Sequence, residues 1–230
     1  MTLRQAGIAA LLTTLVLGAV SGVLFLAAFE LRLEWFTDPA PLVSGGTASA
    51  ELLRWAAIAD LFSYYLATAV VAYVLWTVLR SRGPALADFG TAGAFGYVLI
   101  GGAAASALAF IGPALMNEYS APGTDQAAVA VAFGVLTDVV FRAIWQFLDA
   151  YLLAAWWLGI GLLLRGEQPG FARLSLGLAV VAVIGTAFTV LDVTVARYVA
   201  LAAFFTMWTA WTLWLLVLLW RRRQPFTTLG

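Results

Sequence analysis

Long runs of apolar residues, separated by short polar connections, dominate the hydrophobic pattern of this 230-residue chain. About 20 apolar residues, rising 1.5 Å each, cross the hydrocarbon core of a bilayer as a helix. In hydrocarbon the backbone groups of such a run must bond to one another. The pattern therefore predicts an all-α fold, a polytopic membrane helix bundle whose residues 1–230 form a single integral membrane domain. Six transmembrane helices are expected, at residues 6–29, 53–79, 88–116, 127–164, 171–191 and 197–220.

Composition narrows the class of protein further. Hydrophobic residues make up 63% of the chain and charged residues 10%, whereas a soluble domain is about a quarter charged. The net charge of zero argues against a nucleic-acid partner. Without histidine or cysteine, the chain has no disulfide, no thiolate nucleophile, no Ser-His-Asp triad and no zinc or haem site of the usual kind, so neither a metal nor a cofactor is expected. All twelve basic residues are arginine, and the absence of lysine excludes a retinal Schiff base.

The distribution of arginine predicts the orientation. One set of connections holds most of the arginines, namely Arg4, Arg80, Arg82, Arg165, Arg173 and Arg221 to Arg223. The other set is mainly acidic and holds only Arg32, Arg54 and Arg197. Because cytoplasmic connections are rich in arginine and lysine, both termini are expected in the cytoplasm. Arginine in place of lysine and abundant alanine fit a GC-rich bacterial genome, so we expect a multi-pass protein of the bacterial inner membrane.

The connections differ in length. The turns at residues 80–87 and 165–170 are short, so the helices that they join should be antiparallel neighbours. The connection from Glu30 to Leu52 carries prolines and a Gly-Gly pair and is expected to be irregular. The fourth apolar run is too long to be wholly immersed. Its first part, residues 126–140, is expected to project beyond the membrane or to bend at its surface.

Small and aromatic residues recur inside the predicted helices. Gly101, Ala105, Ala109 and Gly112 form a smooth face on the third helix, and Gly18 and Gly22 form a GxxxG pair on the first. We interpret these faces as tight packing within one bundle rather than as a dimer interface. Five tryptophans also fall within spans, where lipid contact or core packing is favoured over a pigment or quinone pocket: Trp156, Trp157, Trp208, Trp211 and Trp214.

Ionisable residues at membrane depth are candidates for function, because burying them in hydrocarbon costs several kcal/mol. Asp60 lies in the second helix, and Asp149 and Arg142 lie in the fourth. With α-helical periodicity, the polar residues of the fourth helix share one face. We therefore expect an outward-facing polar pocket, for ligand binding or an ion pair, lined by Asp60, Tyr64, Arg142, Gln146 and Asp149.

Two interpretations of this cluster compete. In the functional one, Asp60 and Asp149 form a cation or proton site, and Arg142 tunes them or holds an anionic substrate. In the structural one, Arg142 bridges the two carboxylates, and the network only fixes helix packing. Because charges near the water interface are inexpensive, the structural interpretation is favoured. Asp192 and Arg197 are expected to pair at the outer turn between the fifth and sixth helices.

The layout resembles an uncharacterised bacterial family of six-helix integral membrane proteins that carries only a domain-of-unknown-function label. The resemblance lies in the order and lengths of helices and in three segments: Leu79-Arg80-Ser81-Arg82, Gly161-Leu162-Leu163-Leu164-Arg165 and Pro169-Gly170-Phe171-Ala172-Arg173-Leu174. It covers most of residues 5–220. The resemblance implies a fold but no activity and no site residues.

These observations predict a non-enzymatic membrane protein that acts as a small binding, sensing or accessory subunit. The alternative is a secondary transporter or channel that uses the embedded carboxylates. The cytoplasmic half of the spans lacks carboxylates, apart from Asp88 at the edge of the third helix, which weakens that alternative. An intramembrane enzyme is disfavoured because nucleophile–base pairs are missing. The expected partners are membrane lipid, a small ligand, and a membrane protein or a second copy of the chain.

Overall fold

The computed structural model of the chain describes residues 1–223 and 225–228. Every regular element in that part of the chain is helical. Six helical spans are long and apolar enough to cross a membrane, which confirms the predicted fold. They are Leu3–Ala28, Gly46–Leu79, Pro84–Tyr119, Gln126–Leu163, Pro169–Val190 and Thr194–Trp220.

Two of the spans are composite. The second consists of α2 (Gly46–Asp60), the π-helical segment η3 (Leu61–Leu66) and α3 (Ala67–Leu79). The fourth consists of α5 (Gln126–Thr137), the π-helical segment η4 (Asp138–Leu148) and α6 (Asp149–Leu163). The remaining spans are single helices: α1 (Leu3–Ala28), α4 (Pro84–Tyr119), α7 (Pro169–Val190) and α8 (Thr194–Trp220). Short 3₁₀ turns form η1 (Leu33–Phe36), η2 (Ala40–Ser44) and η5 (Phe226–Thr228).

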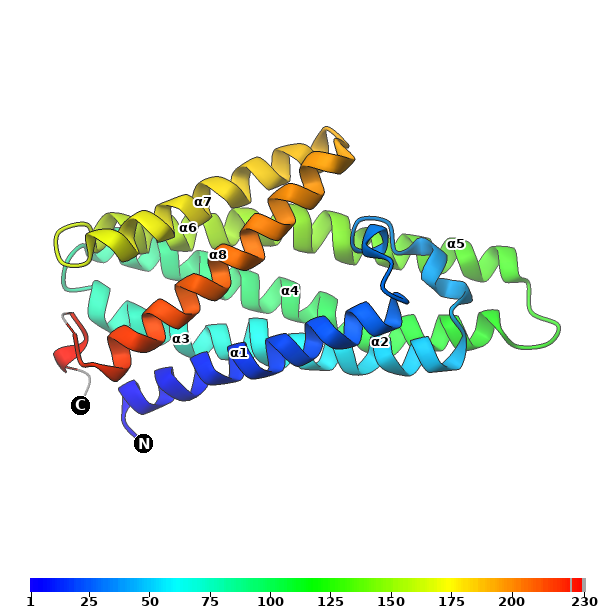
Figure 1. Cartoon of the computed structure of the whole chain (residues 1–230), viewed down its shortest axis with the longest axis horizontal. Helices are drawn as coiled ribbons and strands as arrows, with labels where there is room; N and C mark the ends of the chain where they lie inside the picture. Colours follow the sequence, from blue (N-terminus) through cyan, green and yellow to red (C-terminus); the bar gives the residue numbers. More distant parts are fainter. Residues whose placement is uncertain (224, 229–230) are drawn as a thin grey trace.

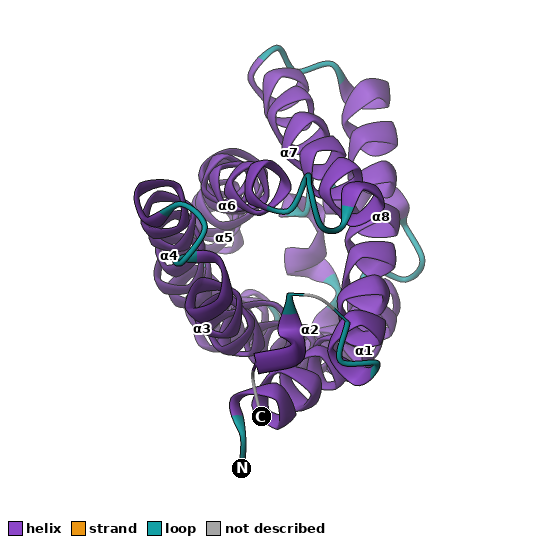
Figure 2. Cartoon of the chain, turned by 90° about the vertical axis from the view of Figure 1, so that its left-hand side faces the viewer, coloured by secondary structure: helices purple, strands orange, loops and turns teal. Residues whose placement is uncertain are grey.

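The spans form a ring. Each span contacts the next one along the chain, and α8 returns to contact α1, as the end-on view in Figure 2 shows. The described termini lie at the same end of the bundle as the α3–α4 and α6–α7 turns (Figure 1), as an even number of spans requires. These two short turns join antiparallel neighbours, as predicted. Which end faces the cytoplasm stays a prediction.

Helix ends follow local sequence. Thr2 and Gln5 form a capping box at the start of α1, and the Asp125 carboxylate accepts a hydrogen bond from the Ala128 amide at the start of α5. Pro84 and Pro169 occupy the first positions of α4 and α7, where a missing N–H costs nothing.

The irregular connection between α1 and α2 is shorter than expected. The expectation of irregular structure up to Leu52 is wrong for residues 46–52, because α2 already begins at Gly46. Gly46 has a φ of +75°, a backbone conformation that glycine adopts without strain. Ala50 and Leu53 are then fully buried, and Leu53 faces Gly112 of α4. Burial of this apolar stripe extends the helix by about two turns.

The small residues of α4 pack inside the bundle, as predicted. A methyl group added at Gly93 would lie 2.6 Å from the Leu152 carbonyl oxygen, and one at Gly112 would lie 3.2 Å from Leu53. Ala105 and Ala109 are buried. The close approach of α4 to its neighbours therefore depends on the missing side chains.

Aromatic residues fill the half of the bundle nearer the termini. The aromatic cluster consists of Trp156, Trp157, Phe171, Trp208 and Trp211. The Trp157 ring lies 5.3 Å from the Trp208 ring, and the Phe171 ring lies 5.3 Å from the Trp211 ring. The Trp211 indole donates a hydrogen bond to the Ser175 hydroxyl at 2.9 Å. Core packing is thus confirmed for these four tryptophans.

The fourth span exceeds the membrane. Its 38 residues would extend about 57 Å, against a hydrocarbon core of about 30 Å. Figure 1 shows α5, with the adjoining ends of α2 and α4, reaching past the turn between α7 and α8.

The orientation can be tested by single-cysteine labelling, because the natural chain has no cysteine. Gly166→Cys lies in the α6–α7 turn and Thr227→Cys in η5, both at the end of the bundle with the termini, and Ala121→Cys lies in the α4–α5 connection at the opposite end (Figure 1). All three positions are exposed. In inverted inner-membrane vesicles, an impermeant maleimide is expected to label the first two and not the third. The reverse pattern would contradict the orientation, and labelling of Gly166→Cys and Thr227→Cys from different faces would contradict the fold.

Candidate functional site

A cavity of about 800 Å³ lies inside the ring, in the half of the bundle away from the termini. It is lined by residues of α1, η1, both composite spans, α4 and α8, and most of its walls are apolar. Four of the five residues predicted to form a pocket line it: Asp60, Tyr64, Gln146 and Asp149. This size is within the usual range for a small-molecule site.

Asp149 is the most buried charged residue of the cavity lining. Its side chain is 3% exposed, and its Oδ2 accepts a hydrogen bond from the Tyr65 hydroxyl at 3.1 Å. Tyr65 packs against the ring of Tyr97, with centroids 4.7 Å apart. The other carboxylate oxygen, Oδ1, is buried and has no hydrogen-bond partner within the described chain. A buried acceptor without a partner is costly and is thus ready to bind a donor.

Gly101 of α4 makes room for this pair. A methyl group at Gly101 would overlap both the Tyr65 ring and Asp149 Oδ2. The hydrogen bond between the second and fourth spans therefore passes directly over a glycine of the third.

Both π-helical segments adjoin the aspartates. Asp60 is the last residue before η3, and Asp149 is the first residue after η4. The Asp149 amide bonds to the Ile144 carbonyl, five residues back, in place of the α-helical partner four residues back. Such insertions are frequent at functional sites because they re-aim side chains without ending the helix.

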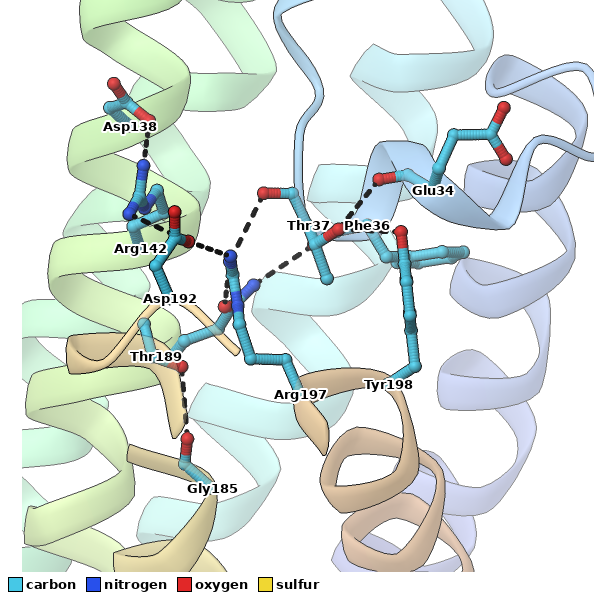
Figure 3. Close-up of polar contacts among 11 residues, drawn as sticks. Glu34, Phe36, Thr37, Asp138, Arg142, Gly185, Thr189, Asp192, Arg197 and Tyr198 are labelled. Atoms are coloured by element: carbon cyan, nitrogen blue, oxygen red, sulfur yellow. Dashed lines mark hydrogen bonds and ion pairs between the residues drawn. The ribbon is translucent and has the colours of Figure 1, made fainter. Parts of the chain in front are cut away.

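Arg142 does not join the predicted pocket. It pairs with Asp138 at 3.9 Å and with Asp192 at 3.5 Å (Figure 3), and it does not line the cavity. The expected bridge from Arg142 to Asp60 and Asp149 is therefore wrong. The prediction assumed α-helical periodicity, which puts Arg142 and Asp149 on one face. Over seven residues of a π-helix, with about 4.4 residues per turn, the two side chains diverge by roughly 150°.

Arg197 forms a clasp at the end of the cavity away from the termini, and Figure 3 shows its contacts with Asp192 and Thr37. Its guanidinium donates to Asp192 at 3.1 Å, to Gln146 Oε1 at 2.9 Å and to the Thr37 carbonyl at 3.3 Å. Gln146 in turn donates to the Phe36 carbonyl at 3.0 Å. The predicted pair of Asp192 with Arg197 is thus confirmed. The clasp joins α8, η4 and the connection that contains η1.

Tyr198 adds a second link at this end. The hydroxyl groups of Thr37 and Tyr198 are hydrogen-bonded at 2.9 Å. Leu33, Glu34 and Phe36 of η1 line the cavity beside this link. The connection that contains η1 is therefore held against the cavity. The expected polar pocket is instead a largely apolar chamber with η1 along one side.

The cavity reaches the surface between α1 and α8. The two helices approach at the end of the bundle that holds the termini, where Gly7 lies against Leu219, and diverge toward the other end (Figure 1). Tyr64 fills the space between them, near Gly18 and 5.1 Å from the Trp208 ring. Beyond Tyr64, the lining includes half-buried residues of α1, Gly22 and Leu26, and exposed residues of α8, Ala202 and Phe205. We call these four residues the mouth.

Two residues that line the cavity were not among those predicted from the sequence. Tyr65 and Trp145 both offer polar groups in the cavity, and the Trp145 indole N–H is buried without a hydrogen-bond partner within the described chain. The tyrosine next to Tyr64 could have been included from the sequence. The orientation of Trp145 could not, because it depends on the π-helical turn. Among the described residues, no group of three or more acidic side chains is arranged to hold a metal ion.

Comparison with protein-family models, with curated proteins and with solved structures finds no match to this chain. The resemblance to a six-helix bacterial family therefore stays a prediction.

Substitution of Gly101 tests whether this glycine leaves the room that Tyr65 and Asp149 occupy. Gly101→Ala is expected to lower the free energy of unfolding by about 1–3 kcal/mol, because the methyl group displaces Tyr65 and Asp149. Gly134→Ala is the matched control, since nothing lies within 4 Å of its added methyl group. That control should be neutral or stabilising by up to about 1 kcal/mol. Thermal unfolding in detergent measures both, and equal behaviour of the two variants would contradict the close contact.

Substitution of Arg197 tests the clasp. The Arg197 side chain is 6% exposed, so Arg197→Met leaves Gln146 and Thr37 without their charged donor and should cost about 1.5–3 kcal/mol. Arg142→Met is the control, because its ion pairs are exposed and such pairs are worth at most about 1 kcal/mol. A larger loss of thermal stability in Arg142→Met than in Arg197→Met would disprove this ranking.

Proposed function

We propose that this chain is a non-enzymatic binding, sensing or accessory protein of the bacterial inner membrane. The observation that carries the proposal is the apolar cavity of about 800 Å³ whose lining includes a buried carboxylate oxygen without a partner. A cavity that only reflected loose packing would have no reason to retain a costly polar group.

The aromatic cluster supports binding over transport. Trp157 and Trp211 are fully buried and fill the bundle between the cavity and the end with the termini. A transporter requires access to its site from both sides. Along this direction the described chain offers packed rings in place of a relay of carboxylates.

A secondary transporter remains the alternative, favoured by one observation: Asp60 and Asp149 share the same membrane-embedded cavity. The two functions differ in their consequences. In a transporter, Asp149→Asn would abolish substrate flux in vesicles while the protein remains folded and inserted. In a binding protein, no flux accompanies binding in either form.

Binding can be tested with 12-bromododecan-1-ol, whose bromine quenches tryptophan fluorescence on contact. Trp145 and Trp208 line the cavity, so the purified protein in phosphatidylcholine nanodiscs should show a saturable quenching component. Gly22→Phe should abolish that component, because the position lines the cavity and an added Cβ meets nothing within 4 Å. The larger ring then occupies the mouth.

Gly134→Phe is the matched control. Gly134 also has open space around its Cβ position, but it lies on α5 and does not line the cavity. It should quench like the natural chain. Saturable quenching that persists in Gly22→Phe, or that never occurs in the natural chain, would refute the proposal.

A further inference from the structure

We propose that the ligand of this cavity is a single-chain amphiphile with a cationic amine at its polar end, which enters from the lipid between α1 and α8. This inference rests on the proposed binding function and names the chemical class of the ligand.

The first observation that favours a cationic ligand is the sign of the charge in the cavity. Three acidic side chains line it, namely Glu34, Asp60 and Asp149, and no arginine of the described chain does. Arg142 is turned outward to Asp138 and Asp192, and Arg197 lies in the clasp. The chain contains no lysine or histidine. No side chain of the lining offers a positive charge to these carboxylates, so a bound cation would be their favourable partner.

The second observation is that the cavity carboxylates lack hydrogen-bond donors. Tyr65 satisfies one oxygen of Asp149 and leaves the other without a donor. The side chain of Asp60 makes no hydrogen bond to the described residues around it. An ammonium group has three donors and a positive charge, so it suits the free oxygen of Asp149, and Asp60 adds negative charge to the same cavity. A carboxylic acid at the same place would bring like charges together.

The third observation is that the cavity walls are mainly apolar. Apart from these acidic groups, the cavity is bounded mainly by aliphatic and aromatic side chains such as Phe25, Phe141 and Leu153. Burial of each methylene group of a ligand contributes about 0.8 kcal/mol. The chamber therefore favours an alkyl or similar apolar body attached to the amine over a small hydrated cation.

The fourth observation is the position of the mouth along α8, which favours entry from the lipid. Ala202 and Phe205 lie about 12 and 17 Å along α8 from its first residue, below the outer end of the bundle. Phe205 is 42% exposed, and the neighbouring surface of α1 is also apolar, with Val20 and Val23 exposed. The clasp and η1 lie at the outer end. A molecule dissolved in the outer leaflet therefore meets this mouth directly.

The test compares three brominated chains that differ only in their polar ends: 12-bromododecylamine, 12-bromododecan-1-ol and 12-bromododecanoic acid. Saturable tryptophan quenching is measured in phosphatidylcholine nanodiscs. The amine is expected to bind at least about tenfold more tightly than the other two, since tenfold corresponds to one modest charge-assisted contact. Butylamine, which lacks the long chain, should not displace it at equal concentration.

Variants assign this preference to the cavity. Asp149→Asn keeps the shape of the side chain and should reduce the affinity for the amine about tenfold while leaving that for the alcohol within about twofold. Unchanged alcohol binding shows that the variant is folded. Arg142→Gln, outside the cavity, should leave all three affinities unchanged.

The outcomes separate the two proposals. Equal binding of all three chains, tighter binding of the acid, displacement by butylamine, or an amine preference that survives in Asp149→Asn would overturn the ligand class and leave the binding function intact. If none of the three brominated chains gives saturable quenching, the binding function itself is overturned.

Discussion

The hydrogen bond from Tyr65 to Asp149 joins the second and fourth spans across Gly101 of the third. In an apolar bundle few other contacts specify how these spans are rotated, because lipid and protein interior are equally apolar. Once the bond is made, Asp149 faces the ring interior, and Tyr64, one residue earlier on η3, lies between α1 and α8. The cavity occupies the space beyond Tyr64.

The π-helical segments explain which part of the site could be read from the sequence. Six spans follow from the length and apolarity of each run, and the role of the α4 glycines follows from their spacing. Neither the length and apolarity of a run nor the spacing of these glycines depends strongly on the helical twist. The relation of Arg142 to Asp149 does depend on twist, because the wider turn of the π-helix, about 0.8 residue more per turn, moves Arg142 to another face over the length of η4. No local residue pattern in this segment distinguishes the two periods.

Tertiary arrangement accounts for the remaining features. Gly22 and Gly18 form one motif, yet Gly18 touches Tyr64 and Gly22 opens into the cavity. The difference arises from the divergence of α1 and α8, which belong to opposite ends of the chain. The partners of Arg197 are likewise distant, since Thr37 is 160 residues away and Gln146 is 51 residues away. Only the Asp192 pair, five residues distant, is local enough to be inferred.

The unequal heights of the spans affect the surrounding bilayer. The fourth span has 38 residues and the fifth has 22, and both start from the same short turn. At 1.5 Å per residue the two differ by about 24 Å. The 22 residues of the fifth span still extend about 33 Å, enough to cross a hydrocarbon core of about 30 Å, so the extra length of the fourth span lies beyond the headgroups. The bundle therefore has a raised side at α4 and α5 and a low side at the α7–α8 hairpin (Figure 1), and the bilayer surface meets protein of unequal height on the two sides.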